Sequence, residues 1–372
     1  MKTIGIPFNP PAHGQPTGVE RYVFELLRAL MDIPIPVNTR IELYSATPLT
    51  IFGELPDGWT NVVLPWRLKG WTHMRLSWFL CMNPPDALFI PAHEIPYRTS
   101  RKTKIIATVH DLAFAIVPEV YPPKERKRQW WALRQLIKRS AHILAVSQST
   151  KQDLMSVAQV PEEKITVTPL AATRVLARPN PEVQRKTLQE FRLRHGQYII
   201  FVGRLEYKKG ILELLRIFDA YKRAQGIGDP LQLVLVGKYG FGEAEIKRLL
   251  GRLARHDIHI LGYVNDTTLS CLLNGARGFI FPTRYEGFGM PLLEAMQLGI
   301  PVLTTDLPVT REVAGVAALY APANDVASWL RIMQQLLRNE DVSKILIEAG
   351  KIQYQKFTWE ETAKITATIL FA

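Results

Sequence analysis

Apolar and polar residues alternate along this chain in two patterns that predict two kinds of secondary structure. Short unbroken apolar runs that end at turn residues predict buried strands, and apolar residues spaced three or four apart predict helices. In the first half the predicted strands are 4–8, 40–46, 86–92, 103–111, 142–148 and 164–170, and the predicted helices are 19–30, 123–140 and 149–159. This order is typical of an α/β domain with a parallel sheet, in which ligands gather at the carboxyl ends of the strands.

The second half repeats the alternation. Its predicted strands are 198–204, 231–238, 258–264, 278–283 and 301–306, and its predicted helices are 209–223, 243–255, 266–274 and one from about Pro291. Residues 173–190 contain two prolines and few apolar residues, so we predict the domain linker just before or within them. A fresh helix is expected from residue 359, where Thr358 and Glu361 fit a capping box. We therefore predict two α/β domains, 1–172 and 173–355, with a cleft between them.

Size and composition limit the class of protein. A chain of 372 residues exceeds the size at which one hydrophobic core stops growing, and 47% hydrophobic with 22% charged residues indicates a folded globular protein. No stretch approaches the apolar length of a membrane span, so we expect a cytoplasmic protein, with peripheral binding at the inner face of the membrane left open. Cys81 and Cys271 lie far apart without metal-ligand spacing, which predicts small buried apolar residues rather than a disulfide or a zinc site.

The net charge of +12 is concentrated in one region. Residues 98–139 hold eleven Lys and Arg against three acidic residues. Within them, 124–139 read as a basic amphipathic helix with Trp130 and Trp131, a composition that suits an anionic membrane surface. A domain helix with Trp130 packed on the sheet and a solvated basic face fits equally well. The aromatic stretch 66–80, with Trp71 and Trp78, is expected in the core or in the wall of an acceptor groove.

The stretch RYEGFGMPLLEAM, residues 284–296, sets two glutamates around a glycine turn and a predicted helix start. Pro291 fits the first helical position, and the glycine turn before it presents free N–H donors to a phosphate. Glu286 and Glu294 then flank an anion site, and their carboxylates could accept hydrogen bonds from the hydroxyls of a nucleotide sugar. The alternative is that Glu286 is a solvated loop residue and Glu294 a helix-start residue that favours the dipole.

A second stretch, FVGRLEYKKG at 201–210, points to the same edge of the sheet. Arg204 follows a predicted strand, and Lys208 and Lys209 stand at the next helix start. Cations there could neutralise a leaving diphosphate. The alternative is that both lysines are ordinary surface residues at a turn.

These residues resemble a known family, the retaining glycosyltransferases of the GT-B class, family four. The resemblance covers nearly the whole chain and is strongest at the E-x7-E motif from Glu286 to Glu294. GRLEYKKG, TVHDLAF at 108–114, PTGVERY at 16–22 and FTWEETA at the end also match. The resemblance implies two Rossmann-like domains with parallel sheets facing across a cleft, and a final helix, 356–372, that crosses back to the first domain. One departure is the first-domain loop, which has Gly14 and Gly18 in place of a glycine doublet.

The family's site residues carry over by position. The implied catalytic set is His110, Arg204, Lys209 and Glu286. The implied donor-binding set is Gly18, Val264, Gly287, Phe288, Gly289, Met290 and Glu294. Glu286 would hold the hydroxyls of the transferred sugar and Glu294 those of the ribose, while the cations would hold the diphosphate.

For three of these residues the implied role is more specific. His110 would lie beside the anomeric carbon, Gly18 would let the first domain approach the phosphates, and Val264 would contact the base. From its sequence position alone, however, a histidine such as His110 beside Asp111 is more often a polar group hydrogen-bonded in a turn than a catalytic residue.

The implied activity is retaining transfer of a mannose-type or glucose-type hexose from a nucleotide-diphosphate sugar to a lipid-linked or polysaccharide acceptor. No cofactor or metal is expected, since no Asp-x-Asp pair is present, and nucleic acid is not an expected partner. Two alternatives stay open: a nucleotide-sugar epimerase of the same architecture, and a basic nucleic-acid-binding protein. The E-x7-E spacing speaks against the first, and the lack of a zinc or helix-turn-helix signature speaks against the second.

Overall fold

A computed structural model describes residues 1–10, 15–92, 94–226, 228–253 and 257–372. The described chain forms two compact units. The N-terminal unit comprises Met1–Ala115, Pro122–Leu170 and Thr358–Ala372, and the C-terminal unit comprises Ile116–Tyr121 and Ala171–Phe357. The short segment 116–121, which the sequence placed in the first domain, therefore groups with the second.

The N-terminal unit is built on a parallel sheet with the order β3-β2-β1-β4-β5-β6-β7. Its strands are β1 (Lys2–Pro7), β2 (Thr39–Ser45), β3 (Trp59–Val63), β4 (Ala87–Ile90), β5 (Lys104–Val109), β6 (Ser140–Ala145) and β7 (Ile165–Val167). The winding direction reverses between β1 and β4, because β2 and β3 extend the sheet one way and β5 to β7 the other. The α/β prediction is confirmed here, although β3 was not predicted.

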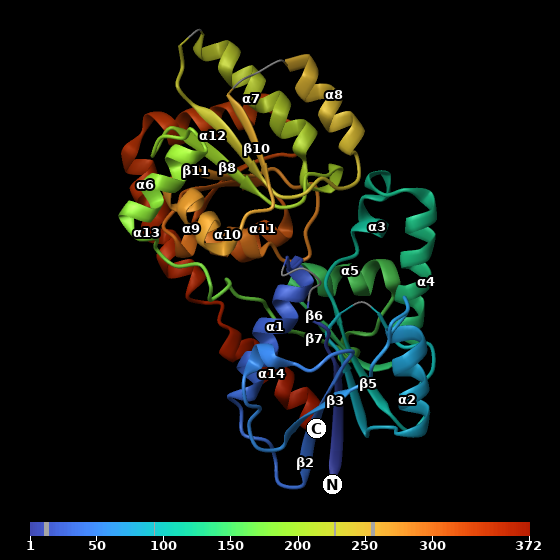
Figure 1. Ribbon diagram of the computed structural model, residues 1–372. Helices are drawn as coiled ribbons and strands as arrows, with labels where there is room; N and C mark the ends of the chain where they lie inside the picture. Colours follow the sequence, from blue (N-terminus) through green and yellow to red (C-terminus); the bar gives the residue numbers. More distant parts are fainter. Residues whose placement is uncertain (11–14, 93, 227, 254–256) are drawn as a thin grey trace. The chain divides into compact units, whose positions relative to one another are not determined.

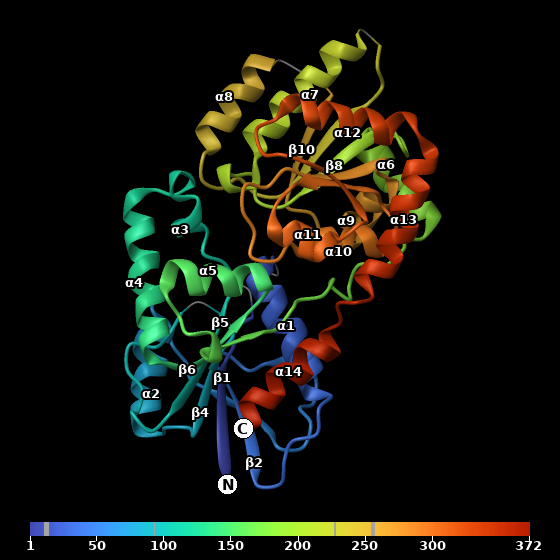
Figure 2. The same cartoon turned by 180° about the vertical axis from the view of Figure 1, so that it is seen from behind.

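Helices flank this sheet. They are α1 (Gly18–Met31), α2 (Ser77–Met82), α3 (Ala113–Ile116), α4 (Pro123–Arg139), α5 (Gln148–Ala158) and α14 (Trp359–Phe371), with a π-helical turn at Thr72–Leu76 before α2. Thr17 and Glu20 form a capping box that starts α1. In both views α14 lies beside α1 (Figure 1, Figure 2), and the Trp359 ring is buried 6.1 Å from the Tyr22 ring.

The C-terminal unit has a second parallel sheet, with the order β10-β9-β8-β11-β12-β13. Its strands are β8 (Tyr198–Val202), β9 (Gln232–Val236), β10 (Ile258–Gly262), β11 (Gly278–Phe281), β12 (Val302–Thr305) and β13 (Ala318–Ala321). Its helices are α6 (Pro181–Glu190), α7 (Ile211–Gln225), α8 (Glu243–Leu253), α9 (Asp266–Gly275), α10 (Met290–Gln297), α11 (Pro308–Ala314), α12 (Val326–Arg338) and α13 (Glu340–Tyr354). The winding direction reverses between β8 and β11.

The predicted linker is wrong in its second half, because α6 occupies 181–190. Asn180 caps this helix by accepting hydrogen bonds from the next amides, and Pro181 takes a position at which its missing N–H costs nothing. One buried face, with Thr187 and Leu188, is enough to hold the helix on α9. A narrow apolar face of this kind is easily missed in a polar stretch.

Two further predictions need correction. Cys81 is exposed, and only Cys271 is buried as predicted. Trp78, expected in the core or a groove wall, has 64% of its surface exposed, whereas Trp71 is half-buried and donates a hydrogen bond to the Leu64 carbonyl. Among the described residues, no helix is long and apolar enough to cross a membrane.

Candidate functional site

The candidate donor site lies where the C-terminal sheet reverses its winding direction. In open parallel sheets such a reversal opens a crevice at the carboxyl ends of the two central strands. Here those strands are β8, followed by 203–210, and β11, followed by 282–289. The sequence predicted the ligand at this edge, and its two motifs occupy these two segments.

A glycine brings the two segments into contact. Gly210 has a φ of 67°, and a Cβ added there would lie 1.9 Å from the Pro282 carbonyl oxygen. Only glycine adopts this conformation at no steric cost, and only glycine leaves room for the carbonyl. The contact is reinforced by the Arg284 amide, which donates to the Lys208 carbonyl at 2.8 Å.

Lys209 and Glu286 form a buried ion pair at this contact. The Nζ of Lys209 lies 2.5 Å from Oε1 of Glu286, and the Thr283 hydroxyl donates to the same oxygen at 2.8 Å. Glu286 is 7% exposed and the Lys209 side chain 16% exposed. The alternatives of a solvated Glu286 and a surface Lys209 are therefore wrong.

This pair keeps unused hydrogen-bonding capacity. A carboxylate has about four acceptor sites, and an ammonium has about three donors, of which the ion pair uses one on each side. Burial of the two charges together fixes their positions without the rearrangement that a solvated pair would need. The pair therefore presents acceptors suited to sugar hydroxyls beside donors suited to phosphate oxygens.

The glycine turn leads directly into α10. Gly289 precedes the helix with a φ of 100° and offers no side-chain cap to its first amides. The helix starts at Met290, one residue before the predicted start, so Pro291 is its second residue. Phe288 is buried with its ring 5.6 Å from Phe357. The turn is thus anchored by this ring, and its backbone amides stand at the positive end of the helix dipole.

Glu294 lies in the second turn of α10 and is 7% exposed. The alternative of a first-turn residue that merely favours the dipole is therefore wrong. Burying a carboxylate costs free energy unless hydrogen-bond or charge partners compensate, so Glu294 is not an ordinary solvated residue.

Arg204 and Val264 join this edge by position rather than by contact. Arg204 follows β8 with a side chain that is 64% exposed, and its Nε lies 3.7 Å from Oε2 of Glu206. Val264 is half-buried in the loop between β10 and α9, at the edge strand of the sheet. The structure thus brings Lys209 and Glu286 into direct contact, with Arg204 on the same segment as Lys209 and Val264 at the edge strand of the sheet.

The candidate residues of the N-terminal unit also follow parallel strands. His110 comes directly after β5, and its Nε2 lies 2.8 Å from the Pro91 carbonyl oxygen, so this nitrogen carries the donated proton. The Tyr22 ring meets the imidazole edge-on at 4.7 Å. Gly18 is the exposed first residue of α1. Gly14 lies outside the described residues.

Sequence reasoning missed Thr283 as a member of the site. Its hydroxyl lies close to Glu286, to the Tyr285 carbonyl and to the Lys208 carbonyl, and so ties the two segments together. The available signal was its place as the last residue of the predicted strand 278–283. Polar residues at that end of a parallel strand belong to the ligand edge.

Two family profiles match this chain in succession. The profile described as "Glycosyltransferase Family 4" matches residues 16–171, and the one described as "Glycosyl transferases group 1" matches residues 184–353. The O-antigen chain mannosyltransferase B of Escherichia coli is 31% identical over 272 residues, which are 73% of this chain and 70% of that protein. The serotype-specific mannosyltransferase WbdA of Escherichia coli is 24% identical over 78% of this chain, but the chain spans only 35% of that protein.

Solved structures with the same fold cover almost the entire chain. WaaG, a glycosyltransferase involved in lipopolysaccharide biosynthesis, superposes with a TM-score of 0.73 at 15% identity and covers 99% of both chains. HepE of Anabaena in complex with UDP-glucose gives a TM-score of 0.72 at 16% identity, over 100% of this chain and 99% of that chain. At these identities the likeness shows the shared fold of two α/β domains.

Proposed function

The chain belongs to family four of the GT-B glycosyltransferases and is a hexosyltransferase, and on that premise we propose that it transfers mannose from a nucleotide-diphosphate donor. The proposed acceptor is a polysaccharide or a lipid-linked glycan. The choice of mannose is supported by the names of both relatives described above, which are mannosyltransferases, and the choice of a glycan acceptor by the name of the first, an O-antigen chain mannosyltransferase.

The buried Lys209–Glu286 pair is the observation that carries the proposed donor site. Lys209 and Arg204 hold the diphosphate, and the amides of 287–289 complete its cradle. Glu286 accepts hydrogen bonds from the hexose hydroxyls, and Glu294 accepts them from the ribose. The base lies near Val264, in the loop after β10, because the resemblance to the family implies a base contact at this position.

The proposed chemistry follows from charge. Breaking the bond between the anomeric carbon and the phosphate oxygen leaves an oxocarbenium-like sugar and added negative charge on the diphosphate. Lys209 is already fixed by Glu286 and turns its remaining N–H groups to that charge. Membership of the family implies retention of configuration, with the departing phosphate taking the proton of the acceptor hydroxyl. In the N-terminal unit the Pro91 carbonyl fixes the orientation of the His110 ring, and the proposed reaction requires no metal.

The decisive experiment identifies the preferred nucleotide base first and the transferred sugar second. Melting temperatures measured with GDP, UDP and ADP identify the nucleotide, because a ligand that binds only the folded state raises the melting temperature. Transfer is then measured with the matching sugar nucleotides, with and without EDTA. We expect GDP to stabilise, GDP-mannose to be consumed, and EDTA to have no effect. Stabilisation by UDP alone, with transfer of glucose, would overturn the assignment of mannose.

We also propose that α4 binds an anionic membrane surface, which would place the acceptor near the enzyme. Leu133 and Leu136 are buried against the unit, while Trp131 is 54% exposed on the same helix as seven Lys and Arg. The helix thus uses one face for the core and keeps an aromatic, basic face in solvent.

The test for α4 is sedimentation with vesicles of phosphatidylglycerol or phosphatidylcholine. Replacing Lys127 and Arg134 with Glu should abolish binding to the anionic vesicles. The matched control replaces the exposed Arg185 and Lys186 of α6 with Glu, an identical change of net charge. Equal losses in both variants would mean that net charge, rather than α4, is responsible.

A further inference from the structure

A pocket of about 530 Å³ opens in the N-terminal unit at the edge opposite to His110. Its lining residues are Cys81, Tyr97, Arg98, Thr99, Ser100, Arg101, Thr103, Ile105 and Arg139. Thr103 precedes β5, and Arg139 ends α4 just before β6, so the pocket lies at the amino ends of these strands. His110 follows the other end of β5, five residues beyond Ile105, or about 16 Å away at ~3.3 Å per residue. The pocket is therefore no part of the candidate site described above.

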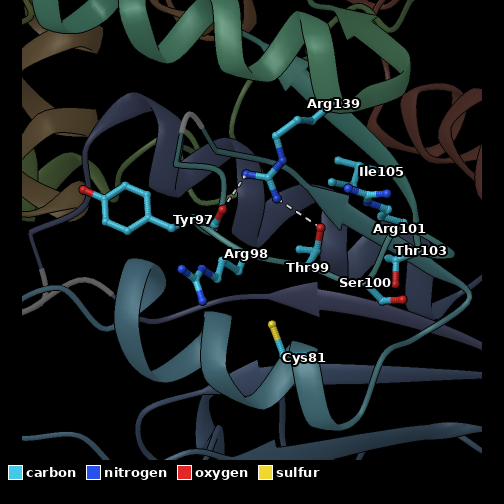
Figure 3. Close-up of a pocket in the computed structure, with 9 residues that line it drawn as sticks. All are labelled: Cys81, Tyr97, Arg98, Thr99, Ser100, Arg101, Thr103, Ile105 and Arg139. Atoms are coloured by element: carbon cyan, nitrogen blue, oxygen red, sulfur yellow. Dashed lines mark hydrogen bonds between the residues drawn. The ribbon is translucent and has the colours of Figure 1, made fainter.

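Arg139 shapes the wall of this pocket. Its guanidinium donates to the Pro96 carbonyl at 2.5 Å, to the Tyr97 carbonyl at 3.4 Å and to the Thr99 hydroxyl at 3.0 Å. Figure 3 shows the side chain reaching over Thr99, with Cys81 rising from α2 on the other side of the space. Burial lowers the pKa of Arg139, yet arginine remains a cation at neutral pH. Arg139 thus fixes the loop that contains Tyr97 and Thr99, and it also adds positive potential to the pocket.

Arg98 and Arg101 supply further cationic groups. Both are exposed, and within the described part of the chain neither side chain forms a hydrogen bond or an ion pair. None of the nine described lining residues is acidic. Two arginines without carboxylate partners, held beside a third in one concavity, create a local positive potential with nothing in the lining to cancel it.

The hydroxyl groups add neutral donors. Thr99 accepts a hydrogen bond from Arg139, and Ser100 accepts one from the Lys102 amide at 3.2 Å. A hydroxyl has one proton and two lone pairs, so each of these groups still has its own proton to donate. The pocket therefore offers guanidinium and hydroxyl donors together, which matches a ligand with several oxyanion acceptors.

We propose that this pocket binds a phosphate ester. Arginine presents a planar set of donors that matches phosphate oxygens in a bidentate manner. The volume falls within the range of small-molecule sites and exceeds what inorganic phosphate fills, so the substituent of the ester occupies the remainder. Ile105 and Tyr97 also line the pocket and add apolar atoms that the substituent can contact. The ester comes either from a soluble sugar or glycerol phosphate or from a lipid headgroup, and the inference does not rest on the transfer reaction.

Cys81 is a built-in reporter for this site. It is the exposed one of the chain's two cysteines, lines the pocket, and is open to a small neutral thiol reagent such as iodoacetamide. We expect glycerol 3-phosphate to slow alkylation of Cys81 about tenfold at ten times its Kd, by mass action. Glycerol at the same concentration should leave the rate unchanged.

The variant Arg98→Gln with Arg101→Gln should lose this protection while keeping the wild-type melting temperature, because neither side chain has a partner to lose. The matched control, Arg185→Gln with Lys186→Gln on α6, should keep the protection. Vesicles distinguish the sources: protection by phosphatidylglycerol but not by soluble ester identifies a lipid headgroup, and protection by glycerol 3-phosphate identifies a soluble ester. Absence of protection by either probe, or protection that persists in the Arg98/Arg101 variant, would overturn the proposal.

Discussion

The two sheets share one winding pattern but place their charges at opposite edges. In the C-terminal unit the carboxyl edge carries Lys209 and Glu286, locked together behind a glycine contact. In the N-terminal unit the same edge carries His110, which donates a hydrogen bond to the Pro91 carbonyl, and the exposed Gly18. Its unpartnered arginines gather at the amino edge instead. The same fold therefore provides a buried ion pair at the carboxyl edge of one sheet and a group of arginines at the amino edge of the other.

This difference suits the two halves of the proposed reaction. A nucleotide diphosphate is charged, and a preorganised charged edge binds it without reorganisation. An acceptor sugar is neutral, and it needs hydrogen-bonding groups and space rather than fixed charge. The comparison can be tested by removing charge from the C-terminal edge.

Replacing Glu286 with Gln should have the largest effect. The amide keeps the shape and the hydrogen bond with Thr283 but removes the negative charge that holds Lys209 and the sugar hydroxyls. We expect kcat to fall about 100- to 1000-fold, the usual loss for a preorganised polar group. The measurement is transfer at saturating donor, with the exposed Glu163→Gln as the control. Near-normal turnover would remove Glu286 from the site.

Replacing Gly210 with Ala should destabilise the C-terminal unit by about 3 kcal/mol, since it adds strain at a positive φ and a clash with Pro282. Gly251 in α8 is the matched control, because a Cβ there meets nothing within 4 Å. Gly251→Ala should stabilise by about 0.5–1 kcal/mol, as expected for a helix interior. Chemical denaturation measures both. Equal effects would mean that the contact between the two segments is not under steric constraint.

Replacing Lys209 with Gln should weaken binding of the nucleoside diphosphate about tenfold and leave binding of the nucleoside nearly unchanged. The reason is that the ammonium is proposed to contact only the phosphates. Isothermal titration with both ligands gives the ratio directly. Equal losses for the two ligands would place Lys209 outside the phosphate site and would break the contrast between the two edges.

Acidification should produce the smallest effect. Burial lowers the pKa of His259, against a smaller opposing effect of Asp257. The Gln232 amide also donates to the His259 ring at 2.9 Å, a bond that protonation would remove. Because the folded-state pKa is below the unfolded value, the stabilisation is complete above the unfolded pKa and is lost as pH falls below about 6.5. Burial also lowers the pKa of His142, so His259→Gln should reduce this part of the slope without removing it, and an unchanged slope would contradict the assignment.

The fold was largely predictable because parallel strands buried on both faces give unbroken apolar runs, and these runs appear in the sequence. β3 escaped prediction because WTNVV mixes polar and apolar residues at a sheet edge. α6 escaped prediction because the two prolines and the low apolar content of residues 173–190 are typical of a linker. A cap residue followed by proline can start a helix even where the spacing of apolar residues does not predict one.

The candidate site was predictable as a set of motifs but not as a set of contacts. The spacing of the motif predicted that Glu286 precedes a helix. It did not predict that Glu286 is buried against Lys209, a residue 77 positions away. Thr283 and Gly210 each act by contacting the other of the two segments. Their roles therefore depend on the pairing of β8 with β11, which brings the two segments together. The pocket at the amino edge likewise requires arginines from two segments, the loop before β5 with Arg98 and Arg101 and the end of α4 with Arg139, and no local pattern encodes their convergence.

The position of α14 has a consequence for synthesis on the ribosome. This helix covers α1 with buried Trp359, and the Phe371 carbonyl accepts a hydrogen bond from Lys2 at 3.0 Å. Lys2 therefore lacks this partner until a residue 369 positions later has been made. Until α14 has been made, the nascent polypeptide exposes the apolar face of α1. Chaperones that bind this face should therefore leave only when translation reaches α14.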